Sequence, residues 1–465
     1  MVSFFVENFG CRAARADGEA VSVRLRTEGM AEAELTEAEI VVVNTCSVTA
    51  DADRDARAFV RKAHRANPAA KIVVTGCYAQ RAPEEISVLE GVTAVVGNSH
   101  KGLLPEIVRG LAIRPSLPPA DLVSPAELLC GGAPIWADDR FAHSFLEEAQ
   151  VLPGAQTRPN LKIQEGCSNR CTFCVIPATR GHSRSLAAEK VLAQVQGFIA
   201  GGGKELVLSG INLGRWGRDL PGSPSFAGLV AEILVETCLP RLRLSSIEPM
   251  DWTAELIGLM REFGGVRLAR HAHLPLQSGS DAVLRRMHRR YRPWHYLQKA
   301  AALIEAAGPE LALGADVMIG FPGETEAEFR ETYDLVASLP FAYLHLFPFS
   351  PRPGTPGWEL HRASPVSPQI VRERMATLRA LAEAKMEAFR KSFIGRTLPA
   401  ITLHTAPVEA AKGRTSALTD NYLPVSLAQS LPANLLVDVE LTGMDAAGIL
   451  QGGTDSSNAR IAVAS

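Results

Sequence analysis

The chain has 465 residues, which is too long for one ordinary domain and predicts two to four. Hydrophobic residues make up 46% and charged residues 21% of the sequence, as is typical of a globular protein, and the formal net charge of -2 leaves any RNA contact to a local patch. No apolar run reaches the ~20 residues that cross a bilayer, and the first residues lack the basic and apolar regions of a signal peptide. We therefore expect a cytoplasmic protein with no membrane partner.

Eight cysteines are few for a chain of this length. Disulfide frameworks are typical of small secreted domains, whereas clustered cysteines in a reducing compartment are more often metal ligands or catalytic thiols. The expected compartment therefore favours metal binding. The cysteines are Cys11, Cys46, Cys77, Cys130, Cys167, Cys171, Cys174 and Cys238.

Apolar strands alternate with a helical stretch in the amino-terminal part of the chain. Residues 3–7, 39–45 and 71–76 have the composition of buried strands, and residues 50–67 have helical spacing. Strands that alternate with helices form βαβ units, so we predict an α/β domain with a parallel sheet. The stretch 116–156 is rich in Pro, Gly and Ala and predicts a linker.

A second α/β series follows the linker. Helix-length stretches separate most of its strands, and right-handed crossovers between six such strands predict a partial (β/α)6 barrel. The strands are 161–164, 205–208, 241–245, 271–276, 315–319 and 343–347, and a charged helix over 369–391 follows them.

The end of the chain changes character. Residues 398–404, 435–442 and 460–464 alternate in a β-like way, with Gly and Asn between them, and predict a small antiparallel β-barrel. The predicted division is an amino-terminal domain (1–115), a linker (116–156), a partial barrel (157–392) and a C-terminal β-barrel (393–465).

Three cysteines form a C-x3-C-x2-C run directly after a predicted strand: Cys167, Cys171 and Cys174. Four-iron clusters are held by cysteine thiolates, and three thiols leave the fourth iron open. A zinc site completed by a distant cysteine is the alternative, but zinc ribbons usually have two paired C-x2-C elements, and the sequence has no second pair. We interpret these thiols as catalytic ligands of an iron–sulfur cluster. The run, with an aromatic residue before its third cysteine, resembles the signature of the radical S-adenosylmethionine (SAM) superfamily, which implies that the open iron binds SAM.

Three further cysteines, Cys11, Cys46 and Cys77, each follow a predicted strand directly. The intervals between them are close to the ~30 residues of a βαβ unit, so parallel strands would bring all three thiols to one carboxyl edge of the sheet, where ligands bind in open α/β folds. Three buried cysteines acting as small hydrophobic residues are the alternative. That alternative does not explain why all three lie at strand ends. We therefore predict a second three-thiolate cluster, and we interpret Cys130 and Cys238 as core or connector residues.

Longer motifs, in order along the chain, resemble the methylthiotransferase family. The resemblance covers essentially the whole chain. One departure is Ala14, where family members usually have Asn three residues after the first cysteine. The motifs are 44–49, 75–77, 96–98, 164–167, 176–181, 275–280 and 320–325.

The resemblance implies an α/β protein with an amino-terminal three-cysteine domain, a radical-SAM barrel and a C-terminal TRAM-like barrel. It implies two 4Fe–4S clusters: one that binds SAM, and an auxiliary cluster, on the three amino-terminal cysteines, that carries the sulfur. It implies that a SAM-derived radical abstracts hydrogen from adenine C2, that sulfur bonds there, and that a second SAM supplies the methyl group. The electron donor and the sulfur source are not identified by it.

Substrates divide the family into branches. The stretches 161–167 and 243–249 look most like the branch that acts on N6-threonylcarbamoyladenosine at position 37, in the anticodon stem-loop of tRNA. Methylthiolation of isopentenyladenosine in tRNA, or of a ribosomal-protein aspartate, is the alternative. A non-catalytic iron–sulfur RNA-binding protein is disfavoured because a scaffold has no need of an open iron beside a barrel.

Strand ends of a barrel collect ligand contacts, so polar residues at these ends are candidates for SAM binding, although loop capping or packing explains any single one as well. The candidates are Ser209, Gly210, Asn212, Glu248, Gln277 and Asp316.

Five arginines in one short segment predict a local RNA contact, because guanidinium groups suit phosphates. A solvated, ion-paired helix face is the alternative. The tail from residue 396 has four Lys and Arg against six Asp and Glu, a balance that would also suit docking of a basic ribosomal protein. The arginines are Arg285, Arg286, Arg289, Arg290 and Arg292.

Overall fold

The computed structural model describes residues 1–113, 132–141 and 157–454, and the chain forms two compact units. Unit 1 comprises Met1–Gln150, Lys162–Leu186 and Ser350–Thr355, and unit 2 comprises Val151–Leu161, Ala187–Phe349 and Pro356–Ser465. The strand expected over 460–464, and Cys130, lie outside the described residues. The division into four segments stays a prediction.

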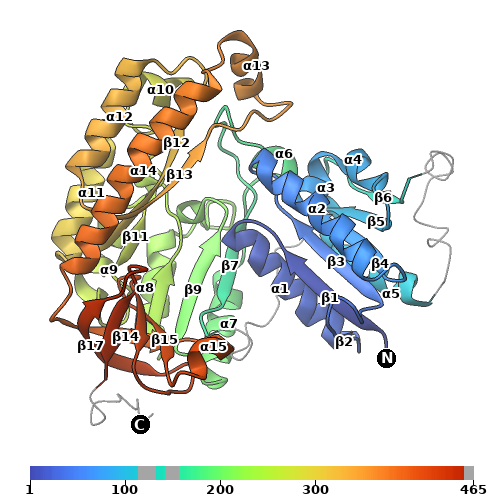
Figure 1. Cartoon of the computed structure of the whole chain (residues 1–465), viewed down its shortest axis with the longest axis horizontal. Coiled ribbons are helices and arrows are strands. Elements are labelled where there is room, and N and C mark those ends of the chain that lie inside the picture. The colour runs from blue at the N-terminus through green and yellow to red at the C-terminus, as the bar shows by residue number, and fades with distance from the viewer. Residues whose placement is uncertain (114–131, 142–156, 455–465) are drawn as a thin grey trace. The chain divides into compact units, whose positions relative to one another are not determined.

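Unit 1 is built on a six-stranded sheet in which each pair of neighbouring strands is parallel, as the βαβ pattern predicts (Figure 1). The sheet order is β2-β1-β3-β4-β5-β6. The strands are β1 (Ser3–Asn8), β2 (Ala31–Glu32), β3 (Ile40–Thr45), β4 (Lys71–Gly76), β5 (Val92–Gly97) and β6 (Ile135–Trp136). Of these, β6 lies within the predicted linker and pairs with β5.

Helices cover both faces of this sheet. Strand β3 is buried on both sides, because Ile40 and Val42 enter one apolar core and Val41 and Val43 enter the other. The first core includes side chains of α1 and α5, and the second includes side chains of α2 and α3. Thr49 caps α2 by accepting from the Ala52 amide at 3.2 Å. The helices are α1 (Arg12–Thr27), α2 (Ala50–Ala66), α3 (Cys77–Arg81), α4 (Pro83–Ser87), η1 (Asn98–Leu103) and α5 (Leu104–Ile113).

Unit 1 also holds most of the antiparallel pair β7 (Asn160–Glu165) and β8 (Arg184–Ser185), with α6 (Ile176–Arg180) between them.

The α/β part of unit 2 contains two parallel sets of strands. β9 (Glu205–Gly210) pairs with β10 (Arg241–Leu244), and β11 (His271–His273), β12 (Ala312–Ile319) and β13 (Phe341–Pro348) form a second set. A parallel bridge between Ser246 and His273 joins the sets. The helices are α7 (Ala188–Ala200), η3 (Leu213–Arg215), α8 (Phe226–Glu236), η4 (Pro249–Asp251), α9 (Ala254–Phe263), α10 (Asp281–Arg286), α11 (Pro293–Ala307), α12 (Glu326–Ser338), α13 (Pro356–Ala363) and α14 (Pro368–Lys391).

A closed five-stranded β-barrel completes unit 2, as predicted (Figure 1). Its order is β14-β15-β16-β18-β17, and one pair, β16 with β18, is parallel although the sequence predicted an antiparallel barrel. The elements are β14 (Thr397–Thr402), α15 (Pro407–Ala410), β15 (Thr415–Thr419), β16 (Pro424–Leu427), β17 (Leu436–Met444) and β18 (Leu450–Gly453).

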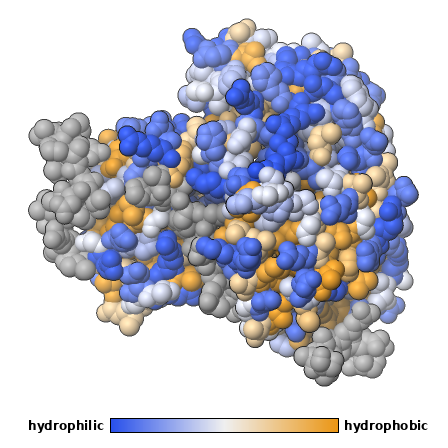
Figure 2. Space-filling model, turned by 180° about the vertical axis from the view of Figure 1, so that it is seen from behind, coloured by the Kyte–Doolittle hydropathy of each residue, from blue (hydrophilic) through white to orange (hydrophobic). Residues whose placement is uncertain are grey.

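The surface mixes hydrophilic and hydrophobic residues on the face drawn in Figure 2. Exposed large hydrophobic side chains such as Val88, Val235 and Trp294 belong to separate elements. Among the helices of the described ranges, none is both long and apolar enough to span a bilayer.

Within unit 2, a set of buried ion pairs around Glu205 connects the β-barrel to the α/β part. Glu205, the first residue of β9, is fully buried and forms ion pairs of 2.7 Å with Arg243, 3.0 Å with Arg158 and 3.3 Å with Arg241. Arg243 also donates to the Thr419 carbonyl of the barrel at 3.1 Å. Burial raises the pKa of Glu205, but the three guanidinium groups outweigh it and lower the pKa to about 2.

Replacing Glu205 with Gln is expected to destabilise unit 2 by ~3 kcal/mol at neutral pH, because three arginines lose their only shared carboxylate. The pKa of Glu205 is depressed, so its contribution is complete above the unfolded value of ~4.3 and is lost as pH falls through the folded value. Chemical unfolding of the wild type and Glu205→Gln between neutral and acidic pH measures the difference. Glu305→Gln, which removes an exposed ion pair with Arg261, is the control. Equal stability of the wild type and Glu205→Gln at neutral pH would contradict the prediction.

Candidate functional site

The three amino-terminal cysteines lie where the strands of unit 1 end. Cys11 is the N-cap of α1, Cys46 follows β3 directly, and Cys77 follows β4 directly and begins α3. The pairs Asn8–Asn44 and Thr45–Gly76 put these strand ends in register.

Gly10 allows the loop that carries Cys11 to approach Cys46. Its φ is +100°, and a Cβ on Gly10 would lie 2.6 Å from the Cys46 sulfur.

The chemistry of these thiols fits thiolate ligands. Burial, followed by the neighbouring Cys77 and Cys11 as like-charged groups, raises the pKa of Cys46 to about 12. Cys46 and Cys77 are buried, and Cys77 accepts hydrogen bonds from Arg180 Nε at 3.2 Å and Asn98 Nδ2 at 3.5 Å. Donors of this kind stabilise thiolate sulfur and tune iron–sulfur clusters.

Thiols that share a cluster need not meet at one point. In the described part of the chain, no three His, Cys, Asp or Glu side chains converge on a single metal ion. A four-iron cluster takes one thiolate on each iron, so its ligands are spread around the cluster.

The second cysteine triad lies in the loop between β7 and α6. Cys167 donates its amide to the Gly181 carbonyl at 3.0 Å, and Cys174 donates its amide to the Cys171 carbonyl at 3.1 Å. Backbone amides of Asn169 and Ile176 donate to the sulfurs of Cys167 and Cys174 at 3.4 and 3.5 Å. The loop therefore supplies hydrogen bonds of the kind found around cluster-bound sulfur.

Five buried charged residues of unit 1 form one ion cluster, which we call the buried ion cluster. Arg180 Nη1 lies 3.0 Å from Asp17 and 2.9 Å from Glu165, Lys101 lies 3.0 Å from Asp17, and Lys162 contacts Asp17 and lies 2.7 Å from Glu165. Sequence reasoning missed this cluster. Glu165 and Arg180 fall inside the family motifs and Lys162 falls in the stretch 161–167, whereas Asp17 and Lys101 lie outside all of them.

The departure at Ala14 is accommodated inside the fold. Ala14 is fully buried, and its carbonyl accepts from Asn44 Nδ2 at 2.6 Å. The backbone just after Cys11 is thus tied to the end of β3.

The predicted SAM contacts belong to unit 2, where three lie within strands and three in the segments that follow strands. Ser209 and Gly210 are the last residues of β9. Asn212, directly before η3, and Gln277 have left-handed φ angles of 57° and 62°. Gln277 forms an isolated parallel β-bridge with Val317 of β12. Ser209 Oγ and Gln277 Oε1 are buried and lack a hydrogen-bond partner among the described residues. Buried polar atoms are normally satisfied, so these two fit contacts with a bound polar group.

The other two candidates already have side-chain partners. Glu248 pairs with Arg289, and Asp316 on β12 lies 3.2 Å from His273. Their place in a SAM site stays a prediction.

A row of rings lies on the β11–β13 sheet. His271 Nε2 lies 2.7 Å from the Tyr343 hydroxyl, and the His273 and His345 rings lie 5.9 and 5.2 Å from the Tyr343 ring. Gly314 leaves room for this, because a Cβ there would lie 2.1 Å from the Tyr343 ring. Sequence reasoning missed the row, although His-x-His and Tyr-x-His at a period of two on strands is a signal that could have found it.

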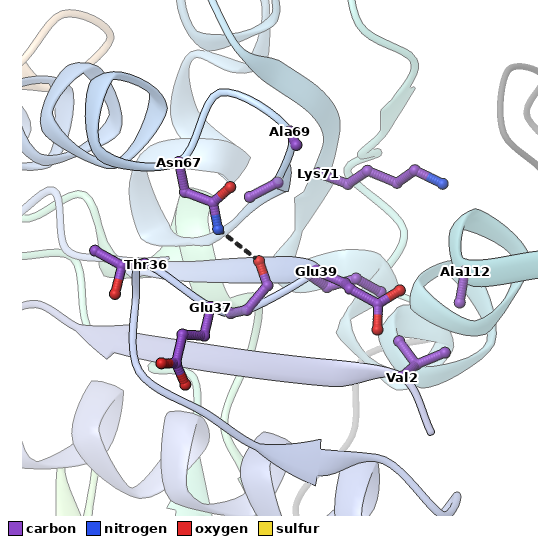
Figure 3. Close-up of a pocket in the computed structure, with 11 residues that line it drawn as sticks. Val2, Thr36, Glu37, Glu39, Asn67, Ala69, Lys71 and Ala112 are labelled. Carbon is purple, nitrogen blue, oxygen red and sulfur yellow. Dashed lines mark hydrogen bonds between the residues drawn. The ribbon is translucent and has the colours of Figure 1, made fainter.

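A cavity of about 250 Å³ in unit 1 lies at the amino ends of β3 and β4 (Figure 3). Glu39 and Lys71 line it, and Asn67 Nδ2 donates to the Ala38 carbonyl beside it at 2.9 Å. It lies at the strand ends opposite to those that carry Cys46 and Cys77, so it is separate from the thiols.

Most of the arginines predicted to contact RNA are ion-paired within unit 2. Arg289 is buried, whereas Arg285 and Arg290 are exposed. The segment therefore offers fewer phosphate contacts than its charge predicts. The pairs are Arg285 and Arg292 with Asp281, Arg286 with Glu328, and Arg289 with Glu248.

Replacing exposed Arg290 with Ala is expected to weaken tRNA binding several-fold and to lower the salt slope of log affinity by ~1, as for one lost phosphate contact. Binding of tRNA measured at several salt concentrations tests this. Arg330→Ala, at an exposed arginine of α12, is the control. An unchanged slope in Arg290→Ala would remove this residue from the RNA contact.

Comparison with known proteins agrees with this geometry. Residues 3–97 match the uncharacterized protein family UPF0004, and residues 161–336 match the radical SAM superfamily. A radical SAM methyltransferase, TsrM from Kitasatospora setae, shares the fold at a TM-score of 0.53 and 15% identity, covering 78% of each chain.

Curated relatives extend over nearly the whole chain. The threonylcarbamoyladenosine tRNA methylthiotransferase MtaB of Bacillus subtilis is 34% identical, covering 91% of this chain and 90% of its own, and that of Rickettsia prowazekii is 33% identical, covering 95% of each. The tRNA-2-methylthio-N(6)-dimethylallyladenosine synthase of Geobacter metallireducens is 32% identical, covering 94% and 95%.

The fold and these matches define a radical SAM transferase. Within that class, the chain belongs to the tRNA methylthiotransferase family. This confirms the family predicted from the sequence, and its reaction is the methylthiolation of tRNA. SAM and two 4Fe–4S clusters, also predicted, are the cofactors of this class of enzyme.

Proposed function

We propose that the protein adds a methylthio group to C2 of N6-threonylcarbamoyladenosine at position 37, in the anticodon stem-loop of a tRNA. The observation that carries this proposal is the presence of two cysteine triads in one compact unit, with Arg180, six residues after the second triad, donating to Cys77 of the first at 3.2 Å. A radical generator close to a second thiol-held cluster suits sulfur insertion. Since tRNA is the substrate, the proposed compartment is the cytoplasm.

Each triad has its own role in this proposal. Cys167, Cys171 and Cys174 hold the cluster that binds SAM, and Cys11, Cys46 and Cys77 hold the auxiliary cluster. When bound, the first cluster and SAM supply the radical chemistry, and the auxiliary cluster supplies sulfur.

Four of the residues predicted to contact SAM keep that role in the proposal. Ser209 and Gln277 offer buried polar atoms that lack partners among the described residues, and Gly210 and Asn212 lie at and just beyond the end of β9.

The assignment to the threonylcarbamoyl branch is supported by the substrates of relatives and by the polar side chains on β11–β13. The relatives from Bacillus subtilis and Rickettsia prowazekii are threonylcarbamoyladenosine tRNA methylthiotransferases, but the dimethylallyladenosine synthase of Geobacter metallireducens is nearly as similar. The ring row on β11–β13 supports the first substrate, because His273, Tyr343 and His345 suit a side group that carries a carboxylate and a hydroxyl. A dimethylallyl group is apolar and gains nothing from such donors.

Deletion of the gene is expected to abolish methylthio-threonylcarbamoyladenosine in tRNA, and Cys171→Ala is expected not to restore it, because the SAM-binding cluster loses a ligand. Mass spectrometry of tRNA nucleosides from the deleted and complemented strains tests this, with the wild-type gene as the control. Loss of the dimethylallyl form instead would reassign the branch. An unchanged profile would refute the tRNA substrate.

The iron content is expected to divide between the triads. Reconstituted Cys77→Ala and Cys174→Ala should each hold about half of the wild-type iron, and a variant that lacks both triads should hold almost none, since each cluster needs its own thiolates. Iron and sulfide assays on anaerobically reconstituted protein measure this, with Cys238→Ala as the control. Full iron in Cys77→Ala would contradict the auxiliary site.

A further inference from the structure

The buried ion cluster of unit 1 carries unequal numbers of positive and negative groups. Its three cationic side chains and its two carboxylates are each at most 6% exposed. When all are ionised, one positive charge is in excess. An uncompensated charge costs several kcal/mol to bury, so this excess requires a counter-charge nearby.

Lys101 is influenced by groups of both signs. Burial lowers the pKa of Lys101, Asp17 raises it, Arg180 and Lys162 lower it, and the Cys77 thiol raises it.

Arg180 is the member of the cluster that faces the thiols. One guanidinium nitrogen, Nη1, contacts Asp17 and Glu165, and Nε donates to the Cys77 sulfur at 3.2 Å. Charge-assisted hydrogen bonds of this kind are about twice as strong as neutral ones.

A second donor fixes the same sulfur. Asn98 Nδ2 lies 3.5 Å from Cys77 Sγ and 2.8 Å from the Thr179 carbonyl, directly before Arg180. The Cys77 sulfur is thus held by one charged and one neutral donor. Backbone amides, which carry no net charge, donate to Cys167 and Cys174 in the other triad.

The one excess positive charge equals in size the net negative charge of a 4Fe–4S cluster held by the three thiolates. Three thiolates outweigh the two positive charges of an oxidised 4Fe–4S core by one negative charge, and net charge is one determinant of cluster potential. We infer that the buried ion cluster is the counter-charge of the auxiliary iron–sulfur cluster, and that Arg180 is the positioning residue that brings this charge to the Cys77 sulfur. The inference rests on the proposed assignment of Cys11, Cys46 and Cys77 as cluster ligands.

Charge variants of the cluster are expected to shift the auxiliary potential in opposite directions. Arg180→Gln removes a positive charge, so reduction becomes harder and the midpoint potential falls. Glu165→Gln removes a negative charge, so the midpoint potential rises. Arg180→Lys keeps the charge and is expected to lie closer to the parent than Arg180→Gln does.

The measurement isolates the auxiliary cluster. The parent is the full chain with Cys167, Cys171 and Cys174 replaced by Ala, reconstituted with iron and sulfide, and its potential is followed by EPR during redox titration. Two controls separate cluster charge from general damage. Arg352→Gln breaks a different buried ion pair, with Asp53, and Arg109→Gln removes a surface charge paired with Glu28.

Opposite shifts for Arg180→Gln and Glu165→Gln, with neither control moving, would support the inference. Shifts of the same sign, or none beyond those of the controls, would overturn it while leaving the proposed function intact. If Arg180→Gln does not fold, the sign of the Glu165→Gln shift decides alone. A parent without iron would instead refute the ligand assignment, and the inference with it.

Discussion

The parallel register of β1, β3 and β4 is the constraint on which the candidate site depends. It brings Cys11, Cys46 and Cys77, which are far apart in sequence, to one edge of one sheet. Side chains alternate along a strand, so a shift of one residue in the register of β3 would move each of its side chains to the opposite face of the sheet. Packing on both faces therefore fixes the register of the strands, and the register fixes the positions of the thiols at the strand ends.

Sequence patterns predicted the long elements and missed the short ones. The strands over 39–45 and 71–76 appear as β3 and β4 with nearly the same bounds, because continuous β-branched runs have few alternatives. The strands β2 and β6 have two residues each and no periodicity to detect, and β15, β16 and β18 of the small barrel have four or five. Pairing at the edges of the sheet makes strands of β2 and β6, and closure of the barrel makes strands of β15, β16 and β18.

The candidate site shows the same limit. Cysteines at strand ends can be recognised in a sequence, because their spacing relative to predicted strands can be read without knowledge of contacts. The buried ion cluster is not visible, because Asp17, Lys101 and Arg180 come from three separate segments and each alone resembles an ordinary surface charge. The arginine segment shows the converse: its charge is obvious in the sequence, and its acidic partners on α10, α12 and the loop before η4 become visible only in the fold.

The ion pairs around Glu205 and the buried ion cluster of unit 1 differ in how their excess positive charge is offset. Around Glu205 three arginines also outnumber the acid, but that excess is dispersed within unit 2. Arg243 donates to the Thr419 carbonyl, Arg243 and Arg158 lie 5.5 and 5.9 Å from the centre of the Tyr422 ring, and Arg158 remains partly exposed. In unit 1 each member of the buried ion cluster is at most 6% exposed, and Arg180 also donates to a sulfur that can become negative only as a thiolate. A backbone carbonyl and a ring face offset the charge in unit 2, whereas the charge in unit 1 is balanced when the thiols are ligands.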